Sequence, residues 1–156
     1  ERGTEQMKRK VRRLMFLAFL VVLLAGCGKT EEGLKDGYYT AQASEYNFGW
    51  KEYITIMVKG GSIVSVEYNA ENSSGFIKSW DNAYMQTMLH ANGTYPNEYT
   101  RFYAGQLLEG QGEGDVDALS GATSSYGSFQ KLAEAVLEQA RQGDSGVVVV
   151  DTTTAE

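Results

Sequence analysis

Hydrophobic and polar residues alternate with a period of two in the first half of the chain, which predicts β-strands. The first strand is expected at residues 37–44, where tyrosine and small side chains alternate. A second is expected at residues 52–59, which are rich in β-branched and aromatic residues. A third follows at residues 62–69, after Gly60 and Gly61, a two-residue turn that can adopt positive φ. The last two segments therefore predict an antiparallel hairpin.

A helical period replaces this alternation after a polar loop at residues 70–79. Large apolar side chains then recur at positions i, i+4 and i+8, namely Trp80, Tyr84 and Met88. This spacing predicts a short amphipathic helix. The helix is expected to end near residues 92–93, where an Asn-Gly pair favours a C-terminal cap.

Two further helices are expected in the second half of the chain. Pro96 suits a first helical turn, and Thr94 is the expected capping residue of a helix that continues through Leu107. The most regular helical pattern covers residues 125–141, whose apolar residues follow the i, i+3, i+4, i+7 series. Between these helices, residues 116–121 are expected to form a short strand that enters a turn.

The order of these elements predicts an α+β domain, in which a small antiparallel sheet with a β-hairpin packs against about three helices. The chain of 156 residues, 42% of them hydrophobic, has room for one such domain, expected at residues 37–142. Residues 143–156 are expected as a polar tail. Within that tail, residues 147–150 either add an edge strand or remain disordered.

The first 26 residues differ from the rest in charge and hydropathy. They contain six basic and two acidic residues, and residues 14–25 are an unbroken apolar run. Twelve helical residues span about 18 Å, much less than the hydrocarbon core of a membrane, so the pattern is typical of a signal peptide. Met7 is the expected start of translation, which makes residues 1–6 an upstream extension.

Cys27 directly follows this apolar run, and the sequence Leu-Ala-Gly-Cys at residues 24–27 resembles the bacterial lipobox. We therefore expect residues 1–26 to be a lipoprotein signal peptide, Cys27 to carry fatty acyl chains such as palmitate, and residues 27–36 to be a tether. The domain would then lie on the extracytoplasmic face of the cell membrane. An ordinary secretory peptide is the alternative, and residues 19–26 are also similar to short pheromone peptides of some Gram-positive bacteria.

Charge and residue counts exclude several classes of function. Residues 27–156 contain eight basic and eighteen acidic residues, and this net charge of −10 disfavours nucleic-acid binding, which needs a basic face. A single cysteine and a single histidine, His90, provide neither a disulfide framework nor a zinc cluster nor a Ser-His-Asp triad. The acidic residues between 109 and 117 lack the spacing of a calcium-binding loop. Catalytic and metal-binding residues are therefore not expected.

One segment, residues 117–125 (DALSGATSS), favours ligand binding because it directly precedes the strongest helical pattern. Three small residues in it allow a ligand to approach the backbone: Ser120, Gly121 and Ala122. The start of the helix offers unpaired N–H groups and the positive end of the helix dipole, which would suit a phosphate at Thr123. The same residues also fit a plain turn in which Ser124 or Ser125 caps the helix.

This segment resembles the flavinylation motif of the FMN-binding domain family, which includes flavin-carrying components of the sodium-translocating NADH:quinone reductase and of the related Rnf complex. In that family an aspartate precedes a Ser/Thr-Gly-Ala-Thr turn, and a separate flavin transferase that uses FAD esterifies the final threonine to FMN. The resemblance implies covalent FMN on Thr123. It implies that the rest of the motif also binds the cofactor: Asp117, Ser120, Gly121, Ala122 and Ser124.

The resemblance extends over about residues 36–141 and includes the membrane-anchored lipoprotein branch of the family. It implies an electron carrier outside the cytoplasmic membrane, rather than a stand-alone enzyme, that accepts electrons from a membrane quinol or NADH oxidoreductase. Ser73, Ser74 and Gly75 would approach the flavin, and Trp80 would stack on its ring. The alternatives are a plain loop for the first three residues and a core anchor for Trp80. The alternative function is a non-redox surface lipoprotein that binds an extracellular small molecule.

Overall fold

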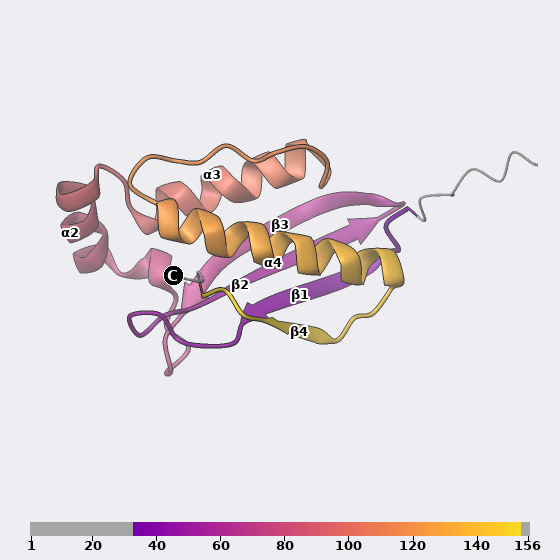
Figure 1. The fold of residues 1–156 in the computed structure, drawn as a ribbon, viewed down its shortest axis with the longest axis horizontal. Coiled ribbons are helices and arrows are strands. Elements are labelled where there is room, and N and C mark those ends of the chain that lie inside the picture. Colours follow the sequence, from indigo (N-terminus) through magenta and orange to yellow (C-terminus); the bar gives the residue numbers. More distant parts are fainter. Residues whose placement is uncertain (1–32, 154–156) are drawn as a thin grey trace, which may run out of the picture. The chain divides into compact units, whose positions relative to one another are not determined.

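The computed structural model describes residues 33–153, which form an α+β domain, as predicted (Figure 1). The predicted leader, Cys27 and most of the tether lie outside the described residues. The described part contains a four-stranded sheet, three α-helices and one 3-10 helix. In chain order the elements are β1 (Gly37–Ala43), β2 (Lys51–Lys59), β3 (Ser62–Glu71), η1 (Lys78–Trp80), α2 (Asn82–Asn92), α3 (Pro96–Glu109), α4 (Thr123–Gln142) and β4 (Val147–Val150).

The sheet has the strand order β3-β2-β1-β4, and the predicted hairpin is present. β1, β2 and β3 pair antiparallel, whereas β4 pairs parallel to β1, so the sheet is mixed rather than purely antiparallel. The stretch at residues 147–150 therefore forms the edge strand that was one of its two expected outcomes. β4 can run parallel to β1 because α4 first carries the chain back along the sheet, as a helix does in other crossover connections.

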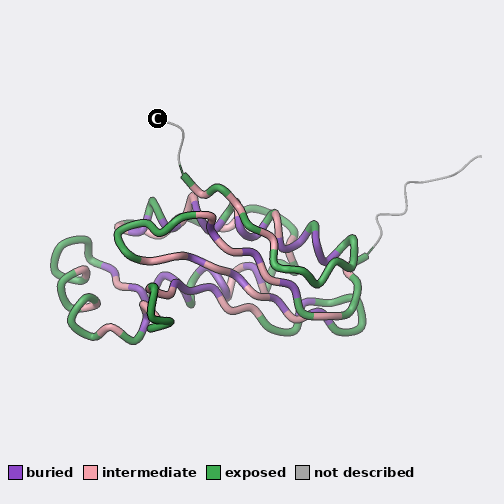
Figure 2. The backbone as a smooth tube through the Cα atoms, turned by 90° about the horizontal axis from the view of Figure 1, so that it is seen from below, coloured by how far each residue is buried: buried purple, intermediate pink, exposed green. Residues whose placement is uncertain are grey.

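A bulge in the hairpin changes which side chains face the core. Gly60 and Gly61 form the two-residue turn with φ values of 63° and 75°. Val58 then pairs with Ile63, but Met57 pairs with Ser65, so Val64 is an extra residue on β3. Strict alternation would place Val64 on the buried face, but the bulge leaves it exposed and brings Ile63 inward. Figure 2 shows the resulting alternation of buried and partly buried positions along the strands.

The hydrophobic core lies between one face of the sheet and the pair of helices α3 and α4 (Figure 1). α4 crosses β1 and β2, and α3 lies over β3. The ring of Phe129 on α4 is stacked on Tyr103 of α3 at 5.3 Å and meets the edge of Tyr68 of β3 at 5.0 Å. These three buried rings join both helices to the sheet at the end where α4 begins. No helix among residues 33–153 is long and apolar enough to span a membrane.

Two local predictions are wrong, each because a side chain forms a hydrogen bond that the sequence pattern could not show. Residues 116–121 form a loop rather than a strand. Thr94 does not cap α3, whose N-cap is Tyr95; the Thr94 hydroxyl instead donates to the carboxylate of Glu98 at 2.8 Å. The predicted short helix is present as α2, which ends at residue 92 with Gly93 as its cap; none of its residues is fully buried, and Met88 is partly buried against the core.

Candidate functional site

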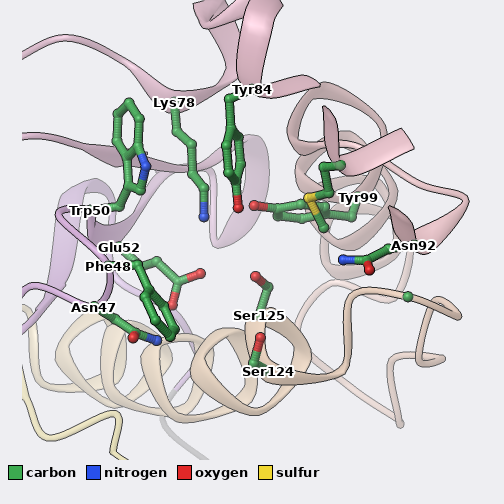
Figure 3. Close-up of a pocket in the computed structure, with 12 residues that line it drawn as sticks. Asn47, Phe48, Trp50, Glu52, Lys78, Tyr84, Asn92, Tyr99, Ser124 and Ser125 are labelled. Carbon is green, nitrogen blue, oxygen red and sulfur yellow. The ribbon is translucent and has the colours of Figure 1, made fainter. Parts of the chain in front are cut away.

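A cavity of about 160 Å³ opens beside the N-terminal end of α4 (Figure 3). One wall is the motif itself, which contributes Gly121, Ser124 and Ser125. The opposite wall comes from the start of β2, from η1 and from the helices α2 and α3. The cavity thus lies where five separate segments of the chain converge, which is typical of a small-molecule binding site.

Thr123 is the first residue of α4 and is exposed to solvent. The N-cap position is Ala122, and no side chain caps the helix, so the predicted capping by Ser124 or Ser125 is wrong. The first helical hydrogen bond runs from the Tyr126 N–H to the Ala122 carbonyl at 2.9 Å. The N–H groups of residues 123–125 precede that bond and have no helical acceptor. They remain as donors at the positive end of a 20-residue helix, where an anion is stabilised.

Side chains of α3 and α4 hold the loop that leads into Thr123. Gln106 of α3 accepts from the Asp117 N–H at 2.8 Å, and the Tyr103 hydroxyl accepts from the Leu119 N–H at 3.2 Å. Tyr126 of α4 donates to the Val116 carbonyl at 2.8 Å. Residues 116–121 were expected to pair with a neighbouring strand. Instead, side chains form hydrogen bonds with single backbone groups of this loop. They position the motif relative to the helix that follows it.

The two residues directly before Thr123 are small because the space around them is full. Ala122 is 2% exposed and belongs to the hydrophobic core. Gly121 has a φ of +82°, and a Cβ atom at this position would collide with the carbonyl oxygen of Asn92 at the end of α2. Glycine is therefore required at residue 121 on two grounds, backbone conformation and close packing. Its contact with α2 joins the motif to the wall that α2 contributes.

A buried carboxylate occupies the sheet side of the cavity. Glu52 is 8% exposed and lies on the core-facing side of β2. The Tyr68 hydroxyl lies 2.8 Å from Glu52 Oε1 and 2.9 Å from the carbonyl oxygen of Ser125. Burial, and then the charge of Glu52, raise the pKa of Tyr68 well above its ordinary value, so the hydroxyl keeps its proton. That proton is shared between two acceptors, and it links β2 and β3 to the first turn of α4.

The remaining wall is aromatic, with one lysine in it. Figure 3 shows Lys78 between Trp50 and Tyr84, with its ammonium group directed into the cavity. Burial lowers the pKa of Lys78, while the charge of Glu52 opposes that shift. Burial also raises the pKa of Tyr99, which lines the same cavity beside Ser125. The cavity therefore combines flat apolar rings with a cation and a carboxylate.

Comparison with known proteins decides the family. Residues 49–138 match the family model of the FMN-binding domain, which is more than half of the chain. The chain belongs to the FMN-binding domain family. It is 33% identical over 140 residues to the 15 kDa lipoprotein of Treponema pallidum (strain Nichols), covering 89% of this chain and 98% of that protein. It is also similar to a crystal structure of a Clostridium perfringens protein, with 37% identity and a TM-score of 0.71, covering 76% and 98% of the two chains.

The site fits the FMN that names the family. The uncapped start of α4 supplies N–H donors for a phosphate, and the aromatic wall offers apolar surface to a planar ring. Only part of the motif lines the cavity. Ser124 lines the cavity beside exposed Thr123, whereas Ser120 and Asp117 are exposed outside it. Within residues 33–153 the carboxylate of Asp117 accepts no hydrogen bond, so the loop is held by the backbone of Asp117 and not by its side chain.

The other residues that were expected near the flavin belong to two segments that lie away from this cavity. Ser74 belongs to an exposed turn in which Asn72 accepts hydrogen bonds from its N–H and its hydroxyl, and Gly75 follows in the same turn. Trp80 is 65% exposed and meets the edge of Phe76, so the alternative that it anchors the core is wrong. Neither segment lines the cavity beside Thr123.

Sequence patterns did not identify five residues of the wall opposite the motif as site residues. These are Trp50, Glu52, Lys78, Tyr84 and Tyr99. One signal was available for Glu52, because it precedes Ile54, Ile56 and Val58 in the series of alternate residues that face the core. A charged residue in a buried series indicates a functional or hydrogen-bonded role. The other four reach the cavity from elements whose relative placement only the fold defines.

Proposed function

We propose that this protein carries FMN through a phosphoester bond to Thr123 and acts as a lipid-anchored electron carrier on the extracytoplasmic face of the membrane. The observation that supports it most is the uncapped start of α4, where exposed Thr123 borders a cavity with aromatic walls. Membership of the FMN-binding domain family supports the identity of the cofactor. The 15 kDa lipoprotein among its relatives supports a lipid anchor at Cys27.

The covalent bond would come from a flavin transferase that uses FAD. The Thr123 hydroxyl attacks the pyrophosphate at the FMN phosphorus; the Oγ1–P bond forms, the P–O–P bridge breaks, AMP leaves and the hydroxyl proton is released. Thr123 suits this step because its side chain is exposed, so an enzyme can reach it. The free N–H groups of the first turn then hold the phosphate oxygens, and the bound FMN supplies redox chemistry to the site.

Within the domain, the cavity lies far from the N-terminal segment around Lys35. The Lys35 N–H donates to the Ala140 carbonyl at 2.9 Å, which ties the entering segment to the C-terminal end of α4. The 20 residues of α4 span about 30 Å, and Thr123 is at the other end. A domain tethered through Cys27 can therefore present its flavin away from the lipid. This arrangement suits a carrier that takes electrons from a membrane quinol or NADH oxidoreductase and passes them outward.

The proposal is tested by substituting the attachment residue in cells that contain the flavin transferase. Thr123→Ala removes the hydroxyl and is expected to abolish visible flavin absorbance after denaturing purification. Thr123→Ser retains a hydroxyl and is expected to restore part of it. Ser124→Ala is the matched control, since it removes a neighbouring hydroxyl and leaves Thr123 intact. Stoichiometric flavin on the alanine variant at residue 123 would contradict the covalent assignment, and a colourless wild type would favour the non-redox lipoprotein.

A further inference from the structure

The cavity wall opposite the motif contains a lysine whose surroundings point to a role of its own. We propose that the Lys78 ammonium contacts the carbonyl edge of the flavin ring and raises the reduction potential of the flavin. The inference rests on the proposed function, because it takes the cavity to hold the ring of FMN attached at Thr123. It assigns to a residue outside the attachment motif the control of how readily the protein accepts electrons.

The backbone of Lys78 is fixed on the sheet. Asn69 of β3 is buried and donates to the Ser79 hydroxyl at 2.8 Å, directly after Lys78. Ile77, directly before it, forms a β-bridge with Glu71. Both neighbours of Lys78 are thus tied to the last residues of β3. The side chain consequently starts from a defined point and extends into the cavity.

Three aromatic rings lie near the ammonium group. Nζ lies 5.3 Å from the ring centroid of Tyr84 and 6.0 Å from the centroids of both Trp50 and Tyr99. All three distances fall within the range of cation–π attraction, which is about 6 Å. The rings stabilise the cation without neutralising it. Within residues 33–153, Nζ forms no ion pair and no hydrogen bond.

The carboxylate that faces Lys78 is already engaged. Glu52 is the acidic residue of the cavity, and its Oε1 accepts from Tyr68 at 2.8 Å. It lies beyond ion-pair distance of Lys78, although its charge still favours the ammonium form. An ammonium ion that has lost part of its water and has no anionic partner is stabilised by any oxygen-rich or negative group that enters the cavity.

A flavin ring provides such a group at its pyrimidine edge, where two carbonyl oxygens lie. Reduction adds electrons to the ring, and the negative charge on that edge rises. A fixed cation beside the edge therefore binds the reduced state more tightly than the oxidised state, and the reduction potential rises. Ser125 lines the same cavity as Lys78 and lies two residues after Thr123, so a ring attached at Thr123 enters a space that the ammonium already faces.

The test compares three substitutions of Lys78 with a distant control. Lys78→Met and Lys78→Gln remove the charge, and Lys78→Arg retains it. Lys59→Met is the matched control: it also removes one positive charge, but at the opposite end of β2, seven residues from Glu52. Intact mass first confirms the attached FMN in each variant, and thermal unfolding confirms the fold. The midpoint potential of the flavin is then measured by spectroelectrochemical titration.

The proposal predicts a lower potential in Lys78→Met and Lys78→Gln. The equilibrium constant for two-electron reduction is expected to fall at least tenfold, which corresponds to about 30 mV. Lys78→Arg and Lys59→Met are expected to stay close to the wild type. Equal potentials in all folded, FMN-loaded variants would overturn the role of Lys78 and leave the covalent flavin intact. A wild type without attached FMN would overturn the proposed function, and this inference with it.

Discussion

The hydroxyl of Tyr68 lies 2.9 Å from the carbonyl oxygen of Ser125, and this contact joins the strand β3 to the first turn of α4. The same hydroxyl lies 2.8 Å from Glu52, so three elements meet at one buried oxygen atom. Because Ser125 is two residues after Thr123, the contact fixes the end of the helix that would hold the flavin phosphate. The packing of the core and the geometry of the site thus depend on the same side chain.

Replacing Tyr68 by phenylalanine tests this link. Tyr68→Phe keeps the ring among its aromatic neighbours but removes the donor to Glu52, which would leave a buried carboxylate unsatisfied. We expect a loss of about 1–3 kcal/mol in the free energy of unfolding, measured by urea denaturation. Tyr38→Phe is the control, because the Tyr38 side chain is exposed on the open face of the sheet. Equal stability of the two variants would contradict the structural role of the hydroxyl.

Gly121 is expected to tolerate no side chain. Gly121→Ala would strain the backbone at positive φ and drive a Cβ atom into the carbonyl group of Asn92. A destabilisation of about 2 kcal/mol or more is expected, together with reduced FMN incorporation because the loop before Thr123 must move. Gly105→Ala in α3 is the matched control: nothing lies within 4 Å of its added Cβ, and it should stabilise the helix. The prediction fails if the two variants are equally stable.

Phe48 occupies a strained turn at the edge of the cavity. Residues 48–49 connect Asn47 and Trp50, whose backbones exchange two hydrogen bonds, and Phe48 has a φ of +49° with 96% of its surface exposed. Asparagine adopts this conformation more readily than phenylalanine. Phe48→Asn is therefore expected to raise the free energy of unfolding by about 1 kcal/mol, while Tyr46→Asn, at a nearby exposed position, should give no gain. An unchanged or lower stability of the first variant would show that the turn is not strained.

Stability is expected to depend on pH through Asp36. Hydrogen bonds from the backbone at Gly60 and Gly61 hold the pKa of Asp36 below its ordinary value, and the Gly61 N–H donates to Oδ1 at 3.0 Å. A carboxylate with a lowered pKa in the folded state stabilises the protein above the unfolded value of 3.8, and this contribution is lost as the pH falls through the folded value. Asp36→Asn should thus be less stable than the wild type at pH 7 and equally stable near pH 2. A stability difference that persists at pH 2 would contradict this account.

The sequence predicted the sheet, the helices and the segment that borders the cavity, because each depends on local periodicity or on contiguous residues. Alternation located β1, β2 and β3, and helical spacing located α4 to within two residues of its start. Alternation failed at Val64, because a bulge shifts the register of β3 by one residue. It also failed at residues 116–121, where the side chains of Gln106 and Tyr103 take the place of a neighbouring strand.

The opposite wall of the cavity could not be predicted in the same way. Lys78 and Trp50 lie 28 positions apart in the sequence, and only the pairing of β2 with β3 brings them to one end of the sheet. Trp80 was expected at the flavin because it is large and aromatic, whereas the tryptophan in the cavity is Trp50. Residue type alone could not show which tryptophan lines the cavity, since side-chain direction depends on the tertiary fold.

The central claim is the bond between FMN and Thr123, and the intact mass of the purified protein tests it most directly. The chain from residue 28 onward is exported from, or co-expressed in, cells that contain a flavin transferase. Its intact mass is measured by mass spectrometry, and peptide mapping then locates the modification. We predict an added mass of one FMN less one water, located on the peptide that contains Thr123. An unmodified mass, or the same addition on a peptide without Thr123, would contradict the account.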